Sequence, residues 1–168
     1  MNLKQKNCET AVGNCGSALK FVPNELKTQE LCEIAVGNDG WALEFIPDEF
    51  KTHKMCKMAV GNDGYTLFHV SDGLKTKELC ELAFENDIWS FEYIPNELKT
   101  QKMCETAVGI NGYTFIHVPD ELKTQKICEI AIRNDTHSLE YVPDELKTQK
   151  MCKTAVGKNG YMLRYIPI

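Results

Sequence analysis

Early in the chain, apolar residues recur at helical spacing and are followed by turn-forming residues. The apolar stripe comprises Leu31, Cys32, Ile34, Ala35 and Val36. Thr28 precedes this stripe as an N-cap and Gly37 follows it as a C-cap, so the pattern predicts a helix of about two to three turns. Asn38, Asp39 and Gly40 tolerate positive φ and predict that the chain reverses there.

A second apolar block follows the turn and ends at a proline. It comprises Trp41, Ala42, Leu43, Phe45 and Ile46, and Pro47 closes it because proline cannot continue a helix interior but can start a new turn. We expect this block to be a second short helix. The equivalent block at 113–118 is rich in β-branched and aromatic residues, so a strand, and with it a leucine-rich-repeat-like α/β solenoid, is the alternative. A leucine-rich repeat favours Asn where this pattern has proline.

The same pattern recurs along the whole chain without a gap. Seven cysteines stand 24 residues apart, at Cys8, Cys32, Cys56, Cys80, Cys104, Cys128 and Cys152. The repeats span approximately 1–25, 26–49, 50–73, 74–97, 98–121, 122–145 and 146–168. A fixed period of this length is typical of a solenoid, in which each unit buries its apolar side against its neighbours. We therefore expect an all-α solenoid of seven helix-turn-helix repeats, forming a single domain over 1–168.

Even and odd repeats differ, which gives the chain a second period of about 48 residues. The even repeats place a glutamate in the second apolar block, at Glu44, Glu92 and Glu140. Repeats three and five instead carry an aromatic residue and a histidine, at Tyr65, His69, Tyr113 and His117. Units that alternate in sequence are most simply units that alternate in environment. We expect two lateral faces, one with the Glu column and one with the Tyr and His column, as candidate interaction surfaces.

The repeat resembles an uncharacterised family with the pattern LKTxxxCxxAV, followed by a turn, aromatic residues and Val/Ile-Pro. In repeat five the pattern is carried by Leu98, Lys99, Thr100, Cys104, Ala107, Val108, Asn111, Gly112, Tyr113 and Pro119. That family, a domain of unknown function in 48-residue modules, occurs in large DNA viruses of amoebae and in some bacteria. The resemblance implies a repeat protein, viral in origin or bacterial, and brings no activity. The chain departs from the pattern at Ser71 and Gly73, and at Ile88 and Thr136 where glycine is usual, so we expect those turns to differ in detail.

Composition and charge restrict the classes of function. The chain is 43% hydrophobic and 26% charged, and no apolar run approaches the roughly 18 residues that a membrane-spanning helix needs. Neither a secretory signal nor a transit peptide is visible at its start. We expect a globular intracellular protein, in the cytoplasm. A net charge of −5 argues against a phosphate backbone as the main partner.

The cysteine ladder is best explained as small apolar core residues. Zinc sites need ligands close in sequence, such as CxxC, and equivalent positions on stacked helices lie too far apart for disulfides. Free thiols indicate a reducing compartment, and we expect no metal or cofactor. Cys15, which is unique to repeat one and lies in the turn, is the thiol most expected to be exposed.

A lysine ladder raises the alternative of nucleic-acid binding. It comprises Lys27, Lys51, Lys75, Lys99, Lys123 and Lys147. A glutamate stands two residues before most of these lysines, so we expect a solvated rim of mixed charge. The chain has only two arginines, Arg133 and Arg164, although arginine is preferred for phosphate and base contacts.

These features favour a non-catalytic protein. No repeat holds a unique cluster of acid, base and nucleophile, so we expect no enzyme activity. The aromatic series Trp41, Tyr65, Trp89, Tyr113 and Tyr161 is interpreted as stapling neighbouring repeats, with a ligand groove as the alternative. The leading hypothesis is a scaffold that binds an unidentified protein partner. The second is self-assembly through terminal repeats that keep Cys8, Ala11 and Val12 at one end and Ile166 at the other.

Overall fold

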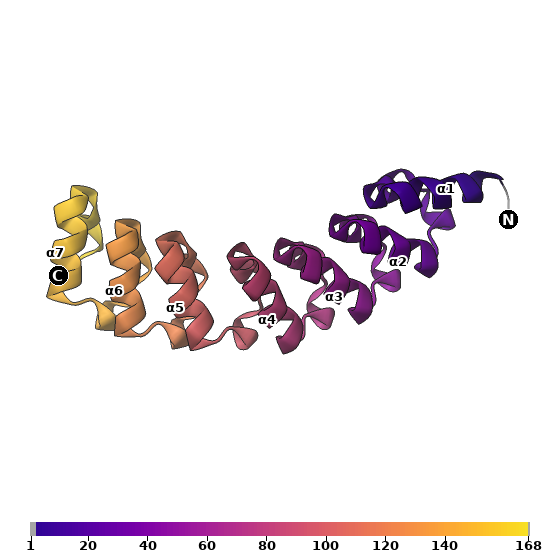
Figure 1. Cartoon of the computed structure of the whole chain (residues 1–168). Coiled ribbons are helices and arrows are strands. Elements are labelled where there is room, and N and C mark those ends of the chain that lie inside the picture. Colours follow the sequence, from indigo (N-terminus) through magenta and orange to yellow (C-terminus); the bar gives the residue numbers. More distant parts are fainter. Residues whose placement is uncertain (1–2, 168) are drawn as a thin grey trace. The chain divides into compact units, whose positions relative to one another are not determined.

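The computed structural model describes residues 3–167, and every regular element in that range is helical (Figure 1). The residue contacts divide the chain into two compact units, one running to Pro95 and the other starting at Asn96, and each is described by itself. No strand occurs between residues 3 and 167, which confirms the all-α repeat solenoid and excludes the leucine-rich alternative. The assignment of one continuous domain to 1–168 stays a prediction.

Each repeat begins with an α-helix of about three turns. These helices are α1 (Leu3–Asn14), α2 (Gln29–Asn38), α3 (His53–Asn62) and α4 (Lys77–Asn86) in the first unit, and α5 (Gln101–Ile110), α6 (Gln125–Asn134) and α7 (Gln149–Lys158) in the second. Thr28 is the N-cap of α2, since its hydroxyl accepts a hydrogen bond of 3.2 Å from the Leu31 amide. The equivalent threonines cap α3 to α7 in the same way. This prediction from sequence is confirmed.

The end of each α-helix differs from the sequence prediction. Gly37 lies inside α2, and the C-cap is Asp39, whose φ of −152° is extended backbone. No described residue, glycine or other, has a positive φ. The Asp39 carboxylate accepts a hydrogen bond of 3.0 Å from the Trp41 amide and so caps the next helix. The chain therefore reverses through an extended capping residue rather than through a left-handed glycine.

The second apolar block is a 3₁₀ helix of six residues in every repeat. These helices are η1 (Gly16–Phe21), η3 (Gly40–Phe45), η5 (Gly64–His69), η7 (Ile88–Tyr93), η9 (Gly112–His117), η11 (Thr136–Tyr141) and η13 (Gly160–Tyr165). They stack on one another within each unit. The predicted second helix is confirmed, and its tighter 3₁₀ form is what a short run between an aspartate cap and a proline allows.

A third, three-residue 3₁₀ turn leads into the next α-helix. These turns are η2 (Asn24–Leu26), η4 (Asp48–Phe50), η6 (Asp72–Leu74), η8 (Asn96–Leu98), η10 (Asp120–Leu122) and η12 (Asp144–Leu146). Ser71 replaces the usual proline before η6, yet its ψ of 145° matches the 141° of Pro47. Ile88 and Thr136 likewise start 3₁₀ helices of ordinary length. The expectation that these turns differ in conformation is wrong, because the capping aspartates and the stacking of neighbours set the backbone.

The cysteine ladder lies in the core that neighbouring repeats share. The side chains of Cys32, Cys56, Cys80, Cys104 and Cys128 are fully buried, and Cys152 is 7% exposed. The alanines three residues later, from Ala35 to Ala155, are also fully buried. The interpretation of the cysteines as small apolar core residues is confirmed for these six repeats, and Cys8 in repeat one is half-buried.

Two kinds of junction alternate along the array. From an odd repeat to the following even one, the 3₁₀ helix meets the next α-helix so closely that glycine is required. A Cβ atom on Gly16 or Gly64 would overlap the carbonyl oxygen of Ala35 or Ala83, respectively. A Cβ on Gly112 would come within 2.8 Å of the Asp135 amide nitrogen. The even repeats tolerate Ile88 and Thr136 at this position, so the absence of glycine there follows from the alternation.

A side-chain amide strengthens the same odd-to-even junctions. The Asn38 amide, at the end of α2, donates to the carbonyl oxygens of Val12 at 3.2 Å and Gly13 at 3.0 Å on α1. Asn86 makes the same pair of bonds to the end of α3, and Asn134 makes it to the end of α5. These bonds satisfy carbonyl groups that a helix end leaves without an intrahelical partner. The structural module is therefore an odd repeat joined to the even repeat that follows it.

Two glycines of repeat three provide a matched test of this close contact. We expect Gly64→Ala to lower the free energy of unfolding by about 1–3 kcal/mol, because the backbone of α4 would have to move. Gly61→Ala, inside α3 with no atom within 4 Å of the added Cβ, should raise it by up to about 1 kcal/mol through helix propensity. Urea denaturation of both variants measures the difference. Equal effects would contradict the account of the junction.

Candidate interaction surface

The lysine ladder is internal rather than a solvated rim. The Lys51 ammonium donates to the His69 carbonyl oxygen at 2.9 Å and pairs with Asp48 at 2.9 Å. The equivalent bonds join Lys27 to Phe45, Lys99 to His117, Lys123 to Tyr141 and Lys147 to Tyr165, at 2.7–3.0 Å. The side chains of Lys51, Lys75, Lys123 and Lys147 are only 7–10% exposed. In these four repeats the ion-pair partner is an aspartate three residues earlier rather than the glutamate two residues earlier.

This bond explains why a lysine recurs at the start of repeats two, three, five, six and seven. The last carbonyl groups of a helix carry partial negative charge and lack intrahelical partners. The lysine closes the end of the 3₁₀ helix in its own repeat and ties it to the beginning of the α-helix. Sequence reasoning missed this role because the two partners lie 18 residues apart. The strict repetition of the lysine was the available signal.

Two lysines of repeat six test the role of the ladder. We expect Lys123→Met to lower the free energy of unfolding by about 1–3 kcal/mol, because the Tyr141 carbonyl and Asp120 both lose a donor whose side chain is only 9% exposed. Lys126, three residues later, forms an exposed ion pair of 2.6 Å with Glu105, and Lys126→Met should leave stability close to wild type. Thermal denaturation followed by circular dichroism compares the two. A larger loss in Lys126→Met would refute the proposed role of the buried ammonium.

The thiols divide into a protected set and one reactive candidate. Burial raises the pKa of Cys104 and Cys128 to about 11, against an opposing effect of the nearby lysines. Cys15 is exposed, as expected, and lies 3.2 Å from the Ser17 hydroxyl. The hydrogen bond with Ser17 lowers the pKa of Cys15. The thiolate, which is the reactive form, is therefore favoured at Cys15 and disfavoured in the core.

Thiol labelling of the native protein checks this division. We expect one thiol, that of Cys15, to react fast with a bulky reagent at neutral pH, and Cys15→Ser to abolish that phase. The six buried cysteines from Cys32 to Cys152 should react only after unfolding. Fast reaction of several thiols in the Cys15→Ser variant would show that the helix stack is open.

The predicted interaction residues all lie on the stacked 3₁₀ helices. Glu44 is on η3, Tyr65 and His69 are on η5, and Glu92 is on η7 in the first unit. In the second unit, Tyr113 and His117 are on η9 and Glu140 is on η11. The Glu44 carboxylate lies close enough to His69 to act on its pKa. In the first unit the two columns therefore lie close together, whereas two distinct lateral faces were expected.

Five rings from three successive repeats join into one group in the first unit. This group, called the aromatic cluster below, consists of Trp41, Tyr65, Phe68, His69 and Tyr93. Trp41 stacks on Tyr65 with ring centroids 5.9 Å apart and meets the edge of His69 at 5.7 Å. Phe68 lies 4.9 Å from both His69 and Tyr93. The aromatic residue after the turn thus staples repeats two and three, as predicted.

Hydrogen bonds fix the positions of the rings in the aromatic cluster. The Tyr65 and Tyr93 hydroxyl groups share a bond of 2.8 Å, and the Trp41 indole donates to Asp63 at 2.9 Å. Burial, followed by bonds with Glu92 and Tyr65, raises the pKa of Tyr93, so its hydroxyl stays protonated. Burial also lowers the pKa of His69, although Glu44 opposes this effect. The cluster is therefore a fixed surface that carries no positive charge of its own at neutral pH.

Much of the aromatic cluster is open to solvent. The Phe68 side chain is 56% exposed and Trp41 is 38% exposed. Sequence reasoning missed Phe68 and Tyr93. Phe68 occupies the position of the Glu column, and this departure was the signal that could have identified it. Exposed apolar patches and aromatic residues are both enriched at surfaces that bind other molecules.

The equivalent surface of the second unit is smaller. Tyr113 is 57% exposed and its ring lies 6.4 Å from His117. Ile116 stands where repeat three has Phe68, so the rings of this unit are not bridged in the same way. Glu140 raises the pKa of Tyr165 through a hydrogen bond. The second unit therefore has residues equivalent to Tyr65 and His69, but the complete aromatic cluster occurs in the first unit.

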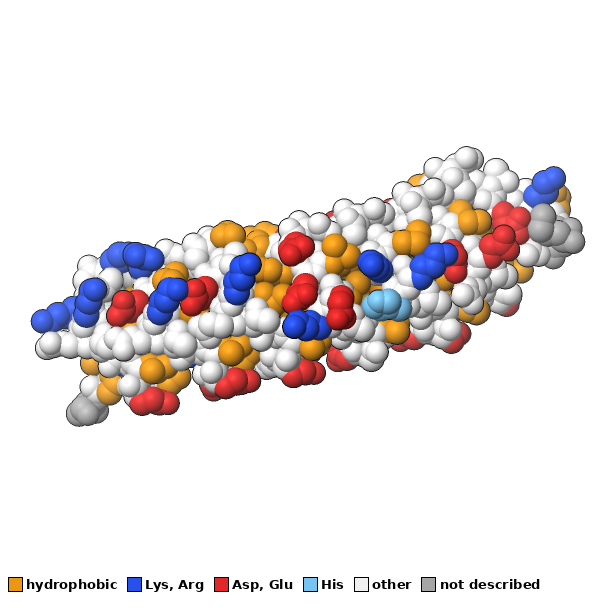
Figure 2. Space-filling view, turned by 60° about the horizontal axis from the view of Figure 1, so that its bottom comes forward, with side chains coloured by type: hydrophobic (Ala, Val, Ile, Leu, Met, Phe, Trp, Pro, Cys, Tyr) orange, Lys and Arg blue, Asp and Glu red, His pale blue; other side chains and the backbone are white. Residues whose placement is uncertain are grey.

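Metal-ligand groups, helix length and surface charge further characterise residues 3–167. That range contains no group of three or more His, Cys, Asp or Glu side chains placed to hold a metal ion. None of the helices in the described part of the chain has the length and apolar character of a membrane span. On the face seen in Figure 2, Lys and Arg side chains are interspersed with Asp and Glu, with hydrophobic side chains between them.

Comparison with known proteins yields one match. A family model described as a domain of unknown function (DUF4116) matches residues 8–51, 54–99, 102–147 and 126–168. The first three matches begin in α1, α3 and α5 and each extends past the 3₁₀ helices of the following even repeat. They therefore coincide with the odd-even modules that the glycine and asparagine contacts define. No curated protein and no solved structure matches the chain significantly.

Proposed function

The chain belongs to the DUF4116 family, and from that premise we propose that it is a non-catalytic scaffold that recognises a protein partner through the aromatic cluster. The observation that carries this proposal is the exposure of fixed rings on the stacked 3₁₀ helices. Recognition hot spots are enriched in rigid aromatic residues, because these bury much apolar area with little loss of side-chain entropy. The ladder lysines and the buried thiols have structural roles, because these lysines close helix ends and these thiols fill the core.

Two observations support a function other than catalysis or nucleic-acid binding. The buried thiols have raised pKa values, which disfavours nucleophilic thiolates. The ladder lysines donate to backbone carbonyl groups and are largely buried, so they are poorly placed to track a phosphate backbone. A gel shift at low salt checks the second argument, and we expect no shifted band.

Site-specific crosslinking tests the proposed recognition surface. A photoreactive amino acid replaces Phe68 in the aromatic cluster or, as a control in the same repeat, Lys57, which is exposed on α3. In cells that naturally contain the protein, we expect a partner to be captured from position 68 and not from position 57. The purified partner should then bind wild type more tightly than Phe68→Ala. Capture of the same proteins from both positions would contradict the proposal.

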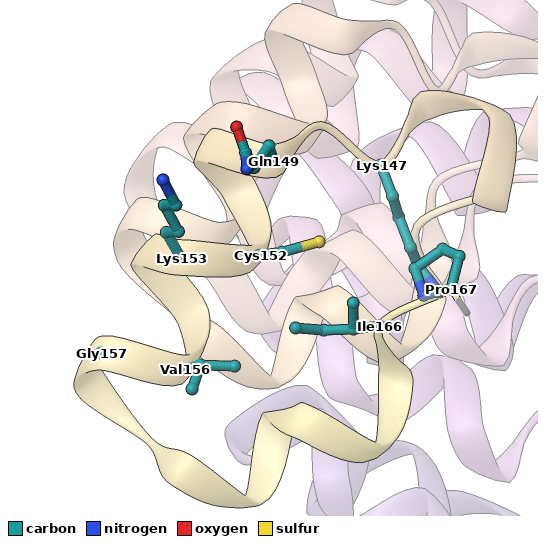
Figure 3. Close-up of a pocket in the computed structure, with 8 residues that line it drawn as sticks. All are labelled: Lys147, Gln149, Cys152, Lys153, Val156, Gly157, Ile166 and Pro167. Carbon is teal, nitrogen blue, oxygen red and sulfur yellow. The ribbon is translucent and has the colours of Figure 1, made fainter.

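A second candidate function, self-assembly, is favoured by the face of α7 and η13 that points away from α6. Leu163 is 66% exposed there, whereas the equivalent Leu139 is fully buried. A cavity of about 570 Å³ adjoins this face, and Cys152, Val156 and Ile166 are among its lining residues (Figure 3). In repeat one, the polar Asn7 occupies the position at which repeat two has the buried Leu31. Pairing of two copies through this one face is therefore favoured over stacking of unlike ends.

The oligomeric state tests self-assembly. If two copies pair through this face, light scattering over a concentration series should show a dimer that Leu163→Lys converts to a monomer. Leu163 is exposed, so this substitution leaves the repeat itself intact. A wild-type protein that stays monomeric at high concentration would eliminate this candidate.

A further inference from the structure

The charges around the aromatic cluster indicate the chemistry of its partner. Glu44 and Glu92 are exposed on the 3₁₀ helices at either side of η5, and Asp63 holds the Trp41 indole. The nearest ladder lysine, Lys51, is largely buried and is paired with Asp48. His69 adds no positive charge at neutral pH, as described above. The surface therefore presents ring faces beside carboxylates, which complements a cation.

The molecule itself places cations on equivalent rings in two other repeats. In repeat one, the Lys20 ammonium lies 4.8 Å from the centroid of the Phe21 ring. In repeat seven, the Arg164 guanidinium lies 4.8 Å from the centroid of the Tyr165 ring. Glu44 and Glu92 occupy the position of these cations in repeats two and four. In repeats two and four this position therefore carries a carboxylate beside an aromatic ring, in place of the cation of repeats one and seven.

Resting on the recognition function proposed above, we propose that the aromatic cluster binds Lys and Arg side chains of an extended basic segment in the partner protein. The rings come from η3, η5 and η7, so successive cations of an extended peptide meet successive repeats. Cation–π contact with Trp41, Tyr65 and Phe68 would supply part of the affinity, and Glu44 and Glu92 would supply charge attraction.

Peptide binding to the full chain tests this inference. The probes are a flexible peptide of alternating Arg, Lys, Gly and Ser and a matched peptide in which Glu and Asp replace its cations. Isothermal calorimetry at low and physiological salt measures both. We expect the basic peptide to bind and the acidic one not to bind. The variants are Phe68→Ala, the double variant Glu44→Gln with Glu92→Gln, and Glu140→Gln as the control in the second unit.

The expected pattern separates the cluster from general charge attraction. Phe68→Ala should weaken binding of the basic peptide at least about threefold, which is the effect of losing one exposed cation–π contact. The double variant Glu44→Gln with Glu92→Gln should weaken it by at least as much, because two attractive charges are lost. Glu140→Gln should bind within twofold of wild type. Circular dichroism confirms that each variant is folded, which the exposure of Phe68 favours.

Three outcomes would overturn the inference: no binding of the basic peptide at millimolar concentration, equal binding of the acidic peptide, or equal weakening by Glu140→Gln. The crosslinked partner separates this failure from that of the proposed function. If the partner binds and loses affinity in Phe68→Ala while the basic peptide does not bind, the recognition function stands and the basic ligand is rejected. If partner binding is independent of Phe68, the recognition function itself is rejected.

Discussion

Each repeat buries its small apolar side chains only by stacking on its neighbours, and every other feature of the structure depends on that contact. A 24-residue unit has too little apolar surface to offset the entropy of ordering its chain. Stacking brings backbones close, which explains the cysteine and alanine core and the glycines that begin the 3₁₀ helices. Close stacking also leaves helix ends in poorly solvated positions, where lysine and asparagine side chains provide the missing hydrogen bonds.

Local and periodic features of this fold could be predicted from the sequence. The N-cap at Thr28, the helix after it and the burial of Cys32 follow from residue type and spacing within one repeat. Features that join distant residues could not be predicted in the same way. The bond from Lys51 to the His69 carbonyl depends on how the two ends of a repeat meet. Glycine is required at position 64 because its backbone contacts α4. From the sequence, the glycine of this turn had instead been attributed to its tolerance of a positive φ.

The candidate surface shows the same division. Tyr65 and His69 were identified because they alternate with the glutamates, but the alternation was interpreted as two distinct lateral faces. The 3₁₀ helices stack in register, so both sets of residues lie together. Phe68 was missed because it breaks the alternation, and its contacts with His69 and Tyr93 depend on the neighbouring repeat. A departure from the repeating pattern therefore marks the ring that links this cluster, and the pattern itself does not predict that link.

The pairing of odd and even repeats limits how such an array can change in length. Gly16 lies in an odd repeat and Asn38 in the even repeat that follows it. The contacts of each residue require a neighbouring repeat of the other kind. Duplication of a single 24-residue unit would place two odd or two even repeats side by side. The new junction would then lack either the asparagine hydrogen bonds or the glycine that allows close contact. Duplication of 48 residues reproduces both junctions in their proper order. A pair of repeats is therefore the unit by which such an array can lengthen while every odd-to-even junction keeps its contacts.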